Sequence, residues 1–159
     1  MMTSGMYSSN SNEWETPQAF YNQLDKKYHF GGDLAATDDN HKCERYLTKK
    51  DNALEQNWQQ FGKGRALFLN PPYGRQIKDW VRKAYEESVG YSAPIVLLIP
   101  ARTDTAYWHD YIFGKAHVSF LRGRLKFEQH GLAVGGVRRF LVQWLFITTR
   151  RPTNEAQDD

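Results

Sequence analysis

Apolar residues recur along the chain with two different spacings, which predict helices in alternation with strands. A first helix is expected from Thr16-Pro17 to about Lys27, because apolar side chains recur there at every fourth residue and Thr16 can cap the first turn. Further helices are expected from Ile77 to about Tyr85 and over 105–113. Strands are expected in the apolar runs 29–36, 65–70, 93–100, 118–121 and 140–148.

The order of these elements predicts an α/β protein with a mostly parallel sheet between helices. The run 93–100 is apolar without alternation, which is typical of a strand covered on both faces. The Gly31-Gly32 pair weakens the strand expected over 29–36. Residues 13–150 are expected to form a single domain, preceded by a flexible polar leader at 1–12 and followed by a polar tail at 151–159.

Composition narrows the classes of protein to consider. The net charge of +3 over 159 residues permits contact with DNA without requiring it. Cys43 is the single cysteine, so no internal disulfide can form, and the spacing of His and Cys residues predicts no metal site. The longest apolar runs, 93–101 and 140–149, are about half of a bilayer span. We therefore expect a soluble, cytoplasmic protein without a membrane segment.

The tetrapeptide Asn70-Pro71-Pro72-Tyr73 directly follows a predicted buried strand, and open α/β sheets place ligands at the carboxyl ends of their strands. A Pro-Pro pair alone is usual in an ordinary loop. Here the prolines fix the backbone so that the carbonyl between Asn70 and Pro72 points outward, beside the side-chain carbonyl of Asn70. Two such acceptors can bind one ring-conjugated amine and stabilise positive charge developing at its nitrogen. Tyr73 offers a face on which a flipped base can stack.

Asn-Pro-Pro-Tyr after an apolar strand resembles the catalytic motif of S-adenosylmethionine-dependent amino-methyltransferases, which act on adenine, cytosine or glutamine side chains. Other segments over roughly 13–130 resemble, in their order, the phage-type DNA adenine N6-methyltransferase family. These segments are Trp14-Glu15-Thr16-Pro17, Asp33-Leu34-Ala35-Ala36, Asp51-Asn52-Ala53-Leu54 with Trp58, Ile99 to Asp104, and Gly123 to Phe127. The resemblance implies a three-layer, Rossmann-like methyltransferase fold and methyl transfer to N6 of adenine in DNA.

The same resemblance implies a pocket for S-adenosylmethionine. Its expected residues are Trp14, Thr16 and Pro17 at the methionine end, Asp33, Leu34 and Ala35 after the first strand, Asp51 beside the cofactor's adenine amino group, and Asn70. An ammonium and an exocyclic amine both need acceptors, which suits these carboxylates. The chain has no Phe-x-Gly-x-Gly loop after the first strand. For residues 38–40 a solvated turn is preferred over a ribose-binding role.

Double-stranded DNA is the expected partner. Contact is expected at Arg102 and along residues 115–126, where basic residues occur without an acid among them. The basic residues chosen for this role are Arg102, Arg122, Arg124 and Lys126. A solvated surface remains the alternative for this charge run. The histidines at 109, 117 and 130 lack the spacing of metal ligands.

The resemblance breaks after Phe127. The family pattern predicts an Ala-Pro-Phe-Pro-Ser segment before an apolar strand, and the chain instead has Val137 to Thr149, VRRFLVQWLFITT. One possible set of codons for these residues, read two bases later, gives Ala-Pro-Phe-Pro-Ser-Pro-Val-Val-Val-Tyr-His-Asn. We therefore hypothesise a frameshift shortly before Val137, in the gene or in its reading. Sequencing the gene tests this, because other codons there would rule the idea out.

Two alternatives to an active DNA methyltransferase remain open from the sequence. The first is a catalytically impaired relative that binds cofactor or DNA, suggested by the altered carboxyl end. The second is a protein glutamine methyltransferase, which the order of the motifs and the lack of an added substrate domain disfavour. A phage or prophage gene in a bacterial host cell is expected. Target sequence, oligomeric state and biological role are not predicted.

Overall fold

The computed structural model describes residues 15–123, 125, 128–129, 132–133 and 144–148. The expected leader and tail, and the site residues Trp14, Arg124 and Lys126, lie outside this part of the chain. In chain order the elements are α2 Gln18–Tyr28, β1 Gly32–Asp33, η1 Lys49–Asp51, η2 Ala53–Glu55, α3 Trp58–Gly62, β2 Leu67–Leu69, α4 Ile77–Ser88, β3 Ile95–Pro100, η3 Trp108–Ile112, β4 His117–Phe120, β5 Glu128–Gln129, β6 Leu132–Ala133 and β7 Trp144–Thr148.

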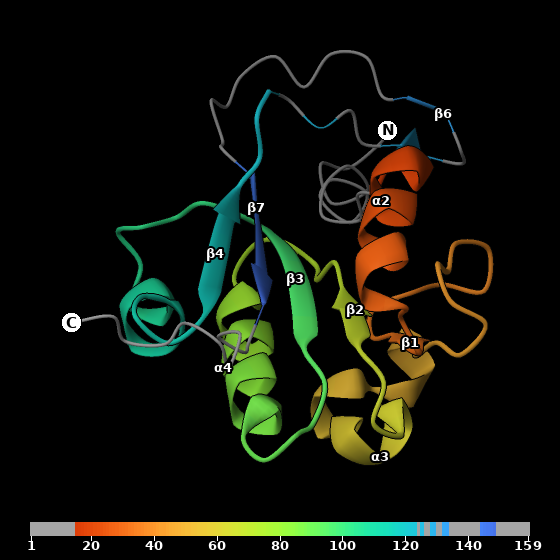
Figure 1. Ribbon diagram of the computed structural model, residues 1–159, viewed down its shortest axis with the longest axis horizontal. Helices are drawn as coiled ribbons and strands as arrows, with labels where there is room; N and C mark the ends of the chain where they lie inside the picture. The colour runs from red at the N-terminus through yellow and green to blue at the C-terminus, as the bar shows by residue number, and fades with distance from the viewer. Residues whose placement is uncertain (1–14, 124, 126–127, 130–131, 134–143, 149–159) are drawn as a thin grey trace, which may run out of the picture.

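Five strands form one sheet in the order β1-β2-β3-β7-β4 (Figure 1). The β1, β2 and β3 strands pair in parallel, whereas β7 is antiparallel to both β3 and β4. It follows that β4 runs in the same direction as the first three strands. A bridge between Asp33 and Tyr46 extends the parallel part beyond β1. The predicted α/β class with a mostly parallel sheet is confirmed.

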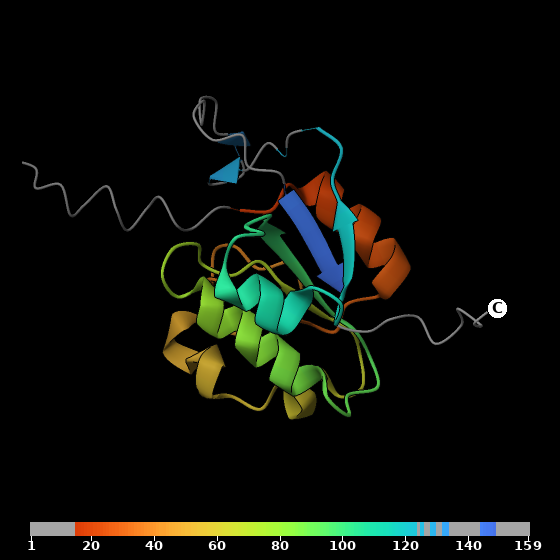
Figure 2. The ribbon, with the colours of Figure 1, turned by 90° about the vertical axis from the view of Figure 1, so that its left-hand side faces the viewer.

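Helical segments cover both faces of the sheet. Figure 2 shows α2 on one side, with α4 and η3 on the other. Along β2, Leu67 and Leu69 join the core cluster that contains residues of α4 and η3, whereas Phe68 packs with Tyr21 and Leu24 of α2. Residues of β3 alternate in the same way, because successive side chains of a strand point to opposite faces. This two-sided burial explains the unalternating apolar run at 93–100.

The first helix follows the prediction, but its cap does not. The N-cap of α2 is Pro17, with no side-chain cap, and the backbone N–H of Tyr21 donates to the Pro17 carbonyl at 3.0 Å. Thr16 is 1% exposed, and its hydroxyl has no hydrogen-bond partner in the described structure. The prediction that Thr16 caps this helix is therefore wrong. Its hydroxyl is left for another role.

The strand predicted over 29–36 is shorter than expected, with only Gly32–Asp33 in β1. It ends there because the Asp33 carboxylate accepts from the backbone N–H of Ala35 at 3.2 Å, which turns the chain. The glycines that weakened the prediction are required by packing. A Cβ on Gly32 would lie 2.4 Å from Cε1 of Phe61, closer than real side chains approach.

We expect Gly32→Ala to lower the free energy of unfolding by about 1–3 kcal/mol, the usual cost of overpacking a core. Urea denaturation measures this change. The double variant with Phe61→Leu should be less destabilised than the two single effects together, since the smaller side chain leaves room for the methyl group. Strict additivity would contradict the steric explanation.

Two other segments refine the predictions. The helix expected over 105–113 is π-helical at Trp108–Ile112, and the N–H of Phe113 donates to the carbonyl of Trp108 at 2.8 Å. The wide turn keeps both Trp108 and Ile112 buried. Of the strand expected over 140–148, the described part is β7, so the apolar run completes the sheet as predicted. No helix among the described residues is long and apolar enough to cross a membrane.

Candidate functional site

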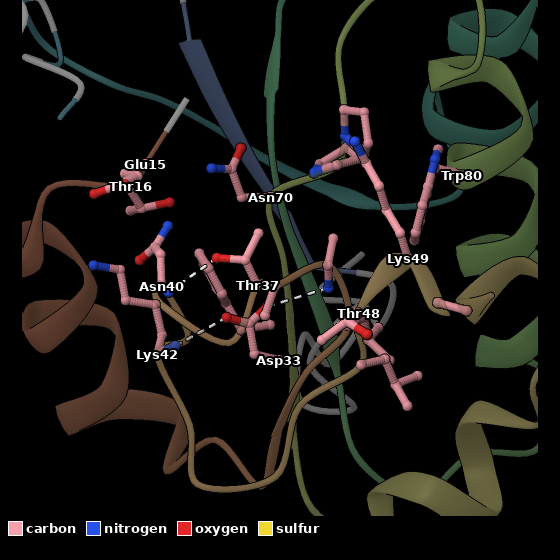
Figure 3. A pocket seen from close by; sticks show the side chains of 18 of the residues that line it. Glu15, Thr16, Asp33, Thr37, Asn40, Lys42, Thr48, Lys49, Asn70 and Trp80 are labelled. Atoms are coloured by element: carbon pink, nitrogen blue, oxygen red, sulfur yellow. Dashed lines mark hydrogen bonds between the residues drawn. The ribbon is translucent and has the colours of Figure 1, made fainter. Parts of the chain in front are cut away.

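A cavity of about 820 Å³ opens at the carboxyl ends of β1 and β2 (Figure 3). Its walls come from the segment before α2, the loop after β1, the η1–η2 region, the loop after β2 and the start of α4. Elements that are distant in sequence therefore meet at one edge of the sheet. This is the place where open α/β sheets bind ligands, and the volume falls within the range of about 300–1,000 Å³ that is usual for small-molecule pockets.

The tetrapeptide at 70–73 forms the loop that leaves β2. Asn70, Pro71 and Pro72 line the cavity, so the structure brings three of the four predicted catalytic residues to one wall. Tyr73 is packed against the core cluster, and its hydroxyl donates to the side-chain oxygen of Asn70. Burial raises the pKa of the Tyr73 phenol well above its ordinary value, so the hydroxyl is a neutral donor at physiological pH.

Asp33 organises the loop that follows β1. Its carboxylate is 3% exposed and accepts from the backbone N–H of Ala35 at 3.2 Å and of Lys42 at 3.0 Å. Desolvation raises the pKa of Asp33, and the two backbone hydrogen bonds offset part of this rise. Ala35 and Lys42, which this carboxylate holds in place, line the cavity, and so does Leu34 between Asp33 and Ala35. Two hydrogen bonds to a buried carboxylate, rather than a run of glycines, thus hold this loop in place.

Thr16 and Pro17 differ in their relation to the cavity. Thr16 lines the cavity, and its hydroxyl has no partner among the described residues. Pro17 is the N-cap of α2 and is not part of the lining. Figure 3 shows Thr16 and Trp80 on opposite sides of Asn70. The cavity therefore has Asn70 between two buried side chains from different elements.

Asp51 has a local role in the structure. Its carboxylate accepts from the backbone N–H of Thr48 at 2.7 Å and from the Thr48 hydroxyl at 3.1 Å, forming a capping box for η1. Asp51 is exposed and does not belong to the lining, although Thr48 and Asn52 on either side of it do. Its expected contact with a cofactor amine stays a prediction.

The loop at 37–42 contains the turn expected at 38–40. The backbone N–H of Asn40 donates to the carbonyl of Thr37 at 3.2 Å and to its hydroxyl at 2.9 Å. Lys42 ties the end of this loop to α2, because its Nζ donates to Oε1 of Gln18 at 2.9 Å. Asn40 and Lys42 both line the cavity, so the loop is a wall of the site as well as a turn.

Several lining residues were not singled out from the sequence as site residues. Among them are Glu15, Lys42, Lys49 and Trp80. Trp80 was predicted only as part of the apolar face of a helix, and lysines are abundant in this chain. The one available signal was the position of Trp80, on the helix that begins directly after the tetrapeptide.

Basic side chains gather at the same edge of the sheet. Arg102 follows β3 and Arg122 follows β4, and both are exposed. Because β2, β3 and β4 run in one direction, these arginines lie at the edge that carries Asn70. Arg75, which sequence reasoning did not select, is exposed just after the tetrapeptide. No ion pair involves any of the three in the part of the chain that the structure describes.

No group of three or more His, Cys, Asp or Glu side chains within the described ranges is arranged to hold a metal ion. The cavity lining offers hydroxyl, amide, carboxylate and ammonium groups together with apolar side chains. Such a set can recognise a polar organic ligand through hydrogen bonds and charge.

Comparison with known proteins points to one family. A family model described as DNA N-6-adenine-methyltransferase (Dam) matches residues 3–147. The chain is 30% identical over 113 residues to the "DNA N-6-adenine-methyltransferase" of Escherichia phage T1, covering 70% of this chain and 45% of that protein. It is 29% identical over 113 residues to the protein of the same name from Haemophilus phage HP1, covering 69% and 62%. The chain thus spans about half the length of the curated relatives it matches.

Proposed function

Because the chain belongs to the DNA N-6-adenine-methyltransferase (Dam) family, we propose that it transfers a methyl group from S-adenosylmethionine to N6 of adenine in double-stranded DNA. The observation that carries this proposal is the position of Asn70. Its half-buried amide stands at the carboxyl end of β2, on the wall of the cavity of about 820 Å³. Methyltransferases of this family use S-adenosylmethionine.

The residues of the cavity fit this cofactor. The buried Thr16 hydroxyl has no partner within the described structure, as expected of a group that hydrogen-bonds a ligand. Glu15 provides a carboxylate for an ammonium group, and Lys42 and Lys49 provide charge for a carboxylate. Thr16 would hold the methionine end, and the Asp33-pinned loop would enclose the same part. When bound, the cofactor supplies an electrophilic methyl group on a sulfonium.

Asn70 would bind the amine that is methylated. Its side-chain oxygen and the Pro71 carbonyl accept hydrogen bonds from the adenine amino group. These bonds stabilise the positive charge that develops on the nitrogen. In the structure the Tyr73 hydroxyl donates to this same oxygen of Asn70. The incoming amine would therefore replace one hydrogen bond with another, so that the acceptor never faces an apolar environment unpaired. The ring of Tyr73 would then be released to stack on the flipped base.

The enzymatic proposal is tested with labelled cofactor and unmethylated DNA. We expect label in N6-methyladenine after digestion of the DNA. Cofactor binding without transfer to DNA would instead support the impaired relative, and label in the glutamine side chains of an added protein would support the protein methyltransferase. Either of these results would overturn the proposal.

Three exposed arginines supply the proposed contacts to the DNA backbone. Arg75, Arg102 and Arg122 follow three strands that end at the edge bearing the cavity. Cations without ion-pair partners can neutralise phosphates and release counterions. The predicted contacts at Arg124 and Lys126 fall on residues outside the described structure, and they remain part of this proposal.

We expect Arg75→Ala, Arg102→Ala and Arg122→Ala each to lower the salt dependence of DNA binding by about one unit of log–log slope. Fluorescence anisotropy with a labelled duplex at several salt concentrations measures the slope. The matched control is Arg82→Ala on α4, because Arg82 contacts Asp79 at 4.0 Å and Glu86 at 3.8 Å. Slopes that equal the wild-type value in all three variants would contradict the assignment.

A further inference from the structure

Trp80 carries a buried hydrogen-bond donor that has no acceptor among the described residues. The residue lies in the first turn of α4 and is 8% exposed, and its ring stacks on Trp58 with centroids 6.3 Å apart. Its indole Nε1 has no hydrogen-bond partner within the described structure, although the atom is shielded from solvent. A buried donor left unpaired is costly, so native proteins retain few of them without a reason.

The neighbouring Trp58 shows how the fold treats an indole that is purely structural. Its Nε1 donates to the backbone carbonyl of Ala53 at 2.7 Å, and its side chain is fully buried. Two tryptophans stack on each other, yet only the one that lines the cavity lacks an acceptor. Because Trp80 is part of the cavity lining, a ligand bound in the cavity could supply the acceptor that the described residues do not.

The surroundings of Trp80 suit a flat aromatic ligand. Pro71 and Pro72 of the loop at 70–73 line the same cavity, and so do Ala53 and Leu54 of η2. These four side chains offer apolar surface to a ligand. Figure 3 draws Lys49 between Asn70 and Trp80, and all three residues line the cavity. A carboxylate of the ligand would bind the ammonium groups of Lys42 and Lys49 in preference to a neutral donor. The indole N–H is therefore suited to a neutral acceptor.

We infer that the indole N–H of Trp80 donates to a ring nitrogen of an adenine bound in this cavity. An indole is a donor only, and the ring nitrogens of adenine are acceptors on a flat π-system. Because Nε1 is covered in this structure, the cavity wall shifts slightly as the ligand enters. The inference rests on the proposed function, under which adenine has two sources: the adenosyl group of the cofactor and the target base of DNA.

The test combines Trp80→Phe with ligands that lack single ring nitrogens. Phenylalanine keeps an aromatic ring and removes the N–H. The first arm measures calorimetrically the Kd of S-adenosylhomocysteine and of its 1-deaza, 3-deaza and 7-deaza analogues, without DNA. The second arm measures the KM of duplexes that carry the corresponding deaza-adenines at the target position. The wild-type protein should bind one analogue about three- to tenfold more weakly than its parent, as expected for one lost hydrogen bond.

Trp80→Phe should bind the parent ligand more weakly by a similar factor and lose the discrimination against that analogue. Loss of discrimination in the first arm identifies the cofactor as the source of the adenine. Loss of discrimination in the second arm identifies the target base. Equal weakening by Trp80→Phe for parent and analogues alike would show a merely structural role and overturn the inference. So would a wild-type protein that discriminates against no analogue in either arm, a result that does not depend on how the variant folds.

Trp58→Phe is the matched control, because Trp58 is not part of the cavity lining and its N–H already donates to the backbone carbonyl of Ala53. It should lower thermal stability while keeping the wild-type discrimination among analogues. Failure of the proposed function gives a different result, namely no transfer to DNA by the wild-type protein. Transfer with no ring-nitrogen discrimination would leave the proposed function standing and remove the role assigned to Trp80.

Discussion

Asn70→Ala is expected to reduce methyl transfer to DNA by about two to three orders of magnitude, the usual effect of removing one polar group that stabilises charge in a transition state. In the proposed function the side-chain oxygen of Asn70 accepts a hydrogen bond from the amine, and alanine offers no acceptor in its place. Single-turnover transfer of labelled methyl groups measures the chemical step without a contribution from product release.

Cofactor affinity should change by no more than about twofold in this variant, because the interaction is made with the amine in the transition state. Asn22→Ala is the control: Asn22 is exposed on α2, and its side chain accepts from Gln18 at 2.9 Å. Transfer by Asn70→Ala at the wild-type rate would refute the role of Asn70. A large loss of cofactor binding would instead assign this side chain to the cofactor.

Asp33→Ala is expected to lower the free energy of unfolding by about 2–4 kcal/mol, because the backbone N–H groups of Ala35 and Lys42 would lose a buried acceptor. The loop after β1 would also lose the two hydrogen bonds that hold it in place. The affinity for the cofactor should therefore fall together with the stability of the fold. Chemical denaturation and calorimetry measure the two effects. Asp110→Ala, at an exposed position in η3, should change neither.

Asp33→Asn separates the charge of this residue from its shape. Because the pKa of Asp33 is raised in the folded protein, the folded state holds the proton more tightly than the unfolded state does. The contribution of Asp33 therefore favours folding below the unfolded value of about 3.9 and declines as pH rises through the folded pKa. Wild-type stability relative to Asp33→Asn should fall over that window. A relative stability that rises with pH would mean that the two backbone hydrogen bonds outweigh desolvation.

The carboxyl end illustrates how far a local pattern can be trusted. The apolar run at 140–148 predicts a strand, and β7 pairs with β3 and β4 in the described part of that run. This pairing does not test the frameshift hypothesis, because an apolar segment of either reading frame could fill the same place. The gene sequence remains the test.

Asp51 has a structural role that the sequence did not predict, and its cofactor contact stays a prediction. An acidic residue in a family-like segment was assigned to the cofactor, yet its carboxylate caps η1 at Thr48. Capping depends on a backbone conformation three residues away, which residue type alone does not specify. The prediction that Thr16 caps a helix was wrong, since the helix begins at Gln18, after Pro17.

By itself the sequence determined the alternation of strands and helices, the two-sided burial of β3 and the place of Asn70 after a buried strand. Each of these features depends on residues close together in the chain. The spacing of apolar residues determines the elements and their burial, and the motif with its two stiff prolines determines the place of Asn70. Tertiary structure alone decided which distant residues share the cavity. It brought Thr16, Asp33 and Trp80 to the wall that holds Asn70, and among the described residues it left the Trp80 donor without an acceptor. The physical reason is that hydrogen-bond partners and cavity walls are set by packing between elements, which no local pattern encodes.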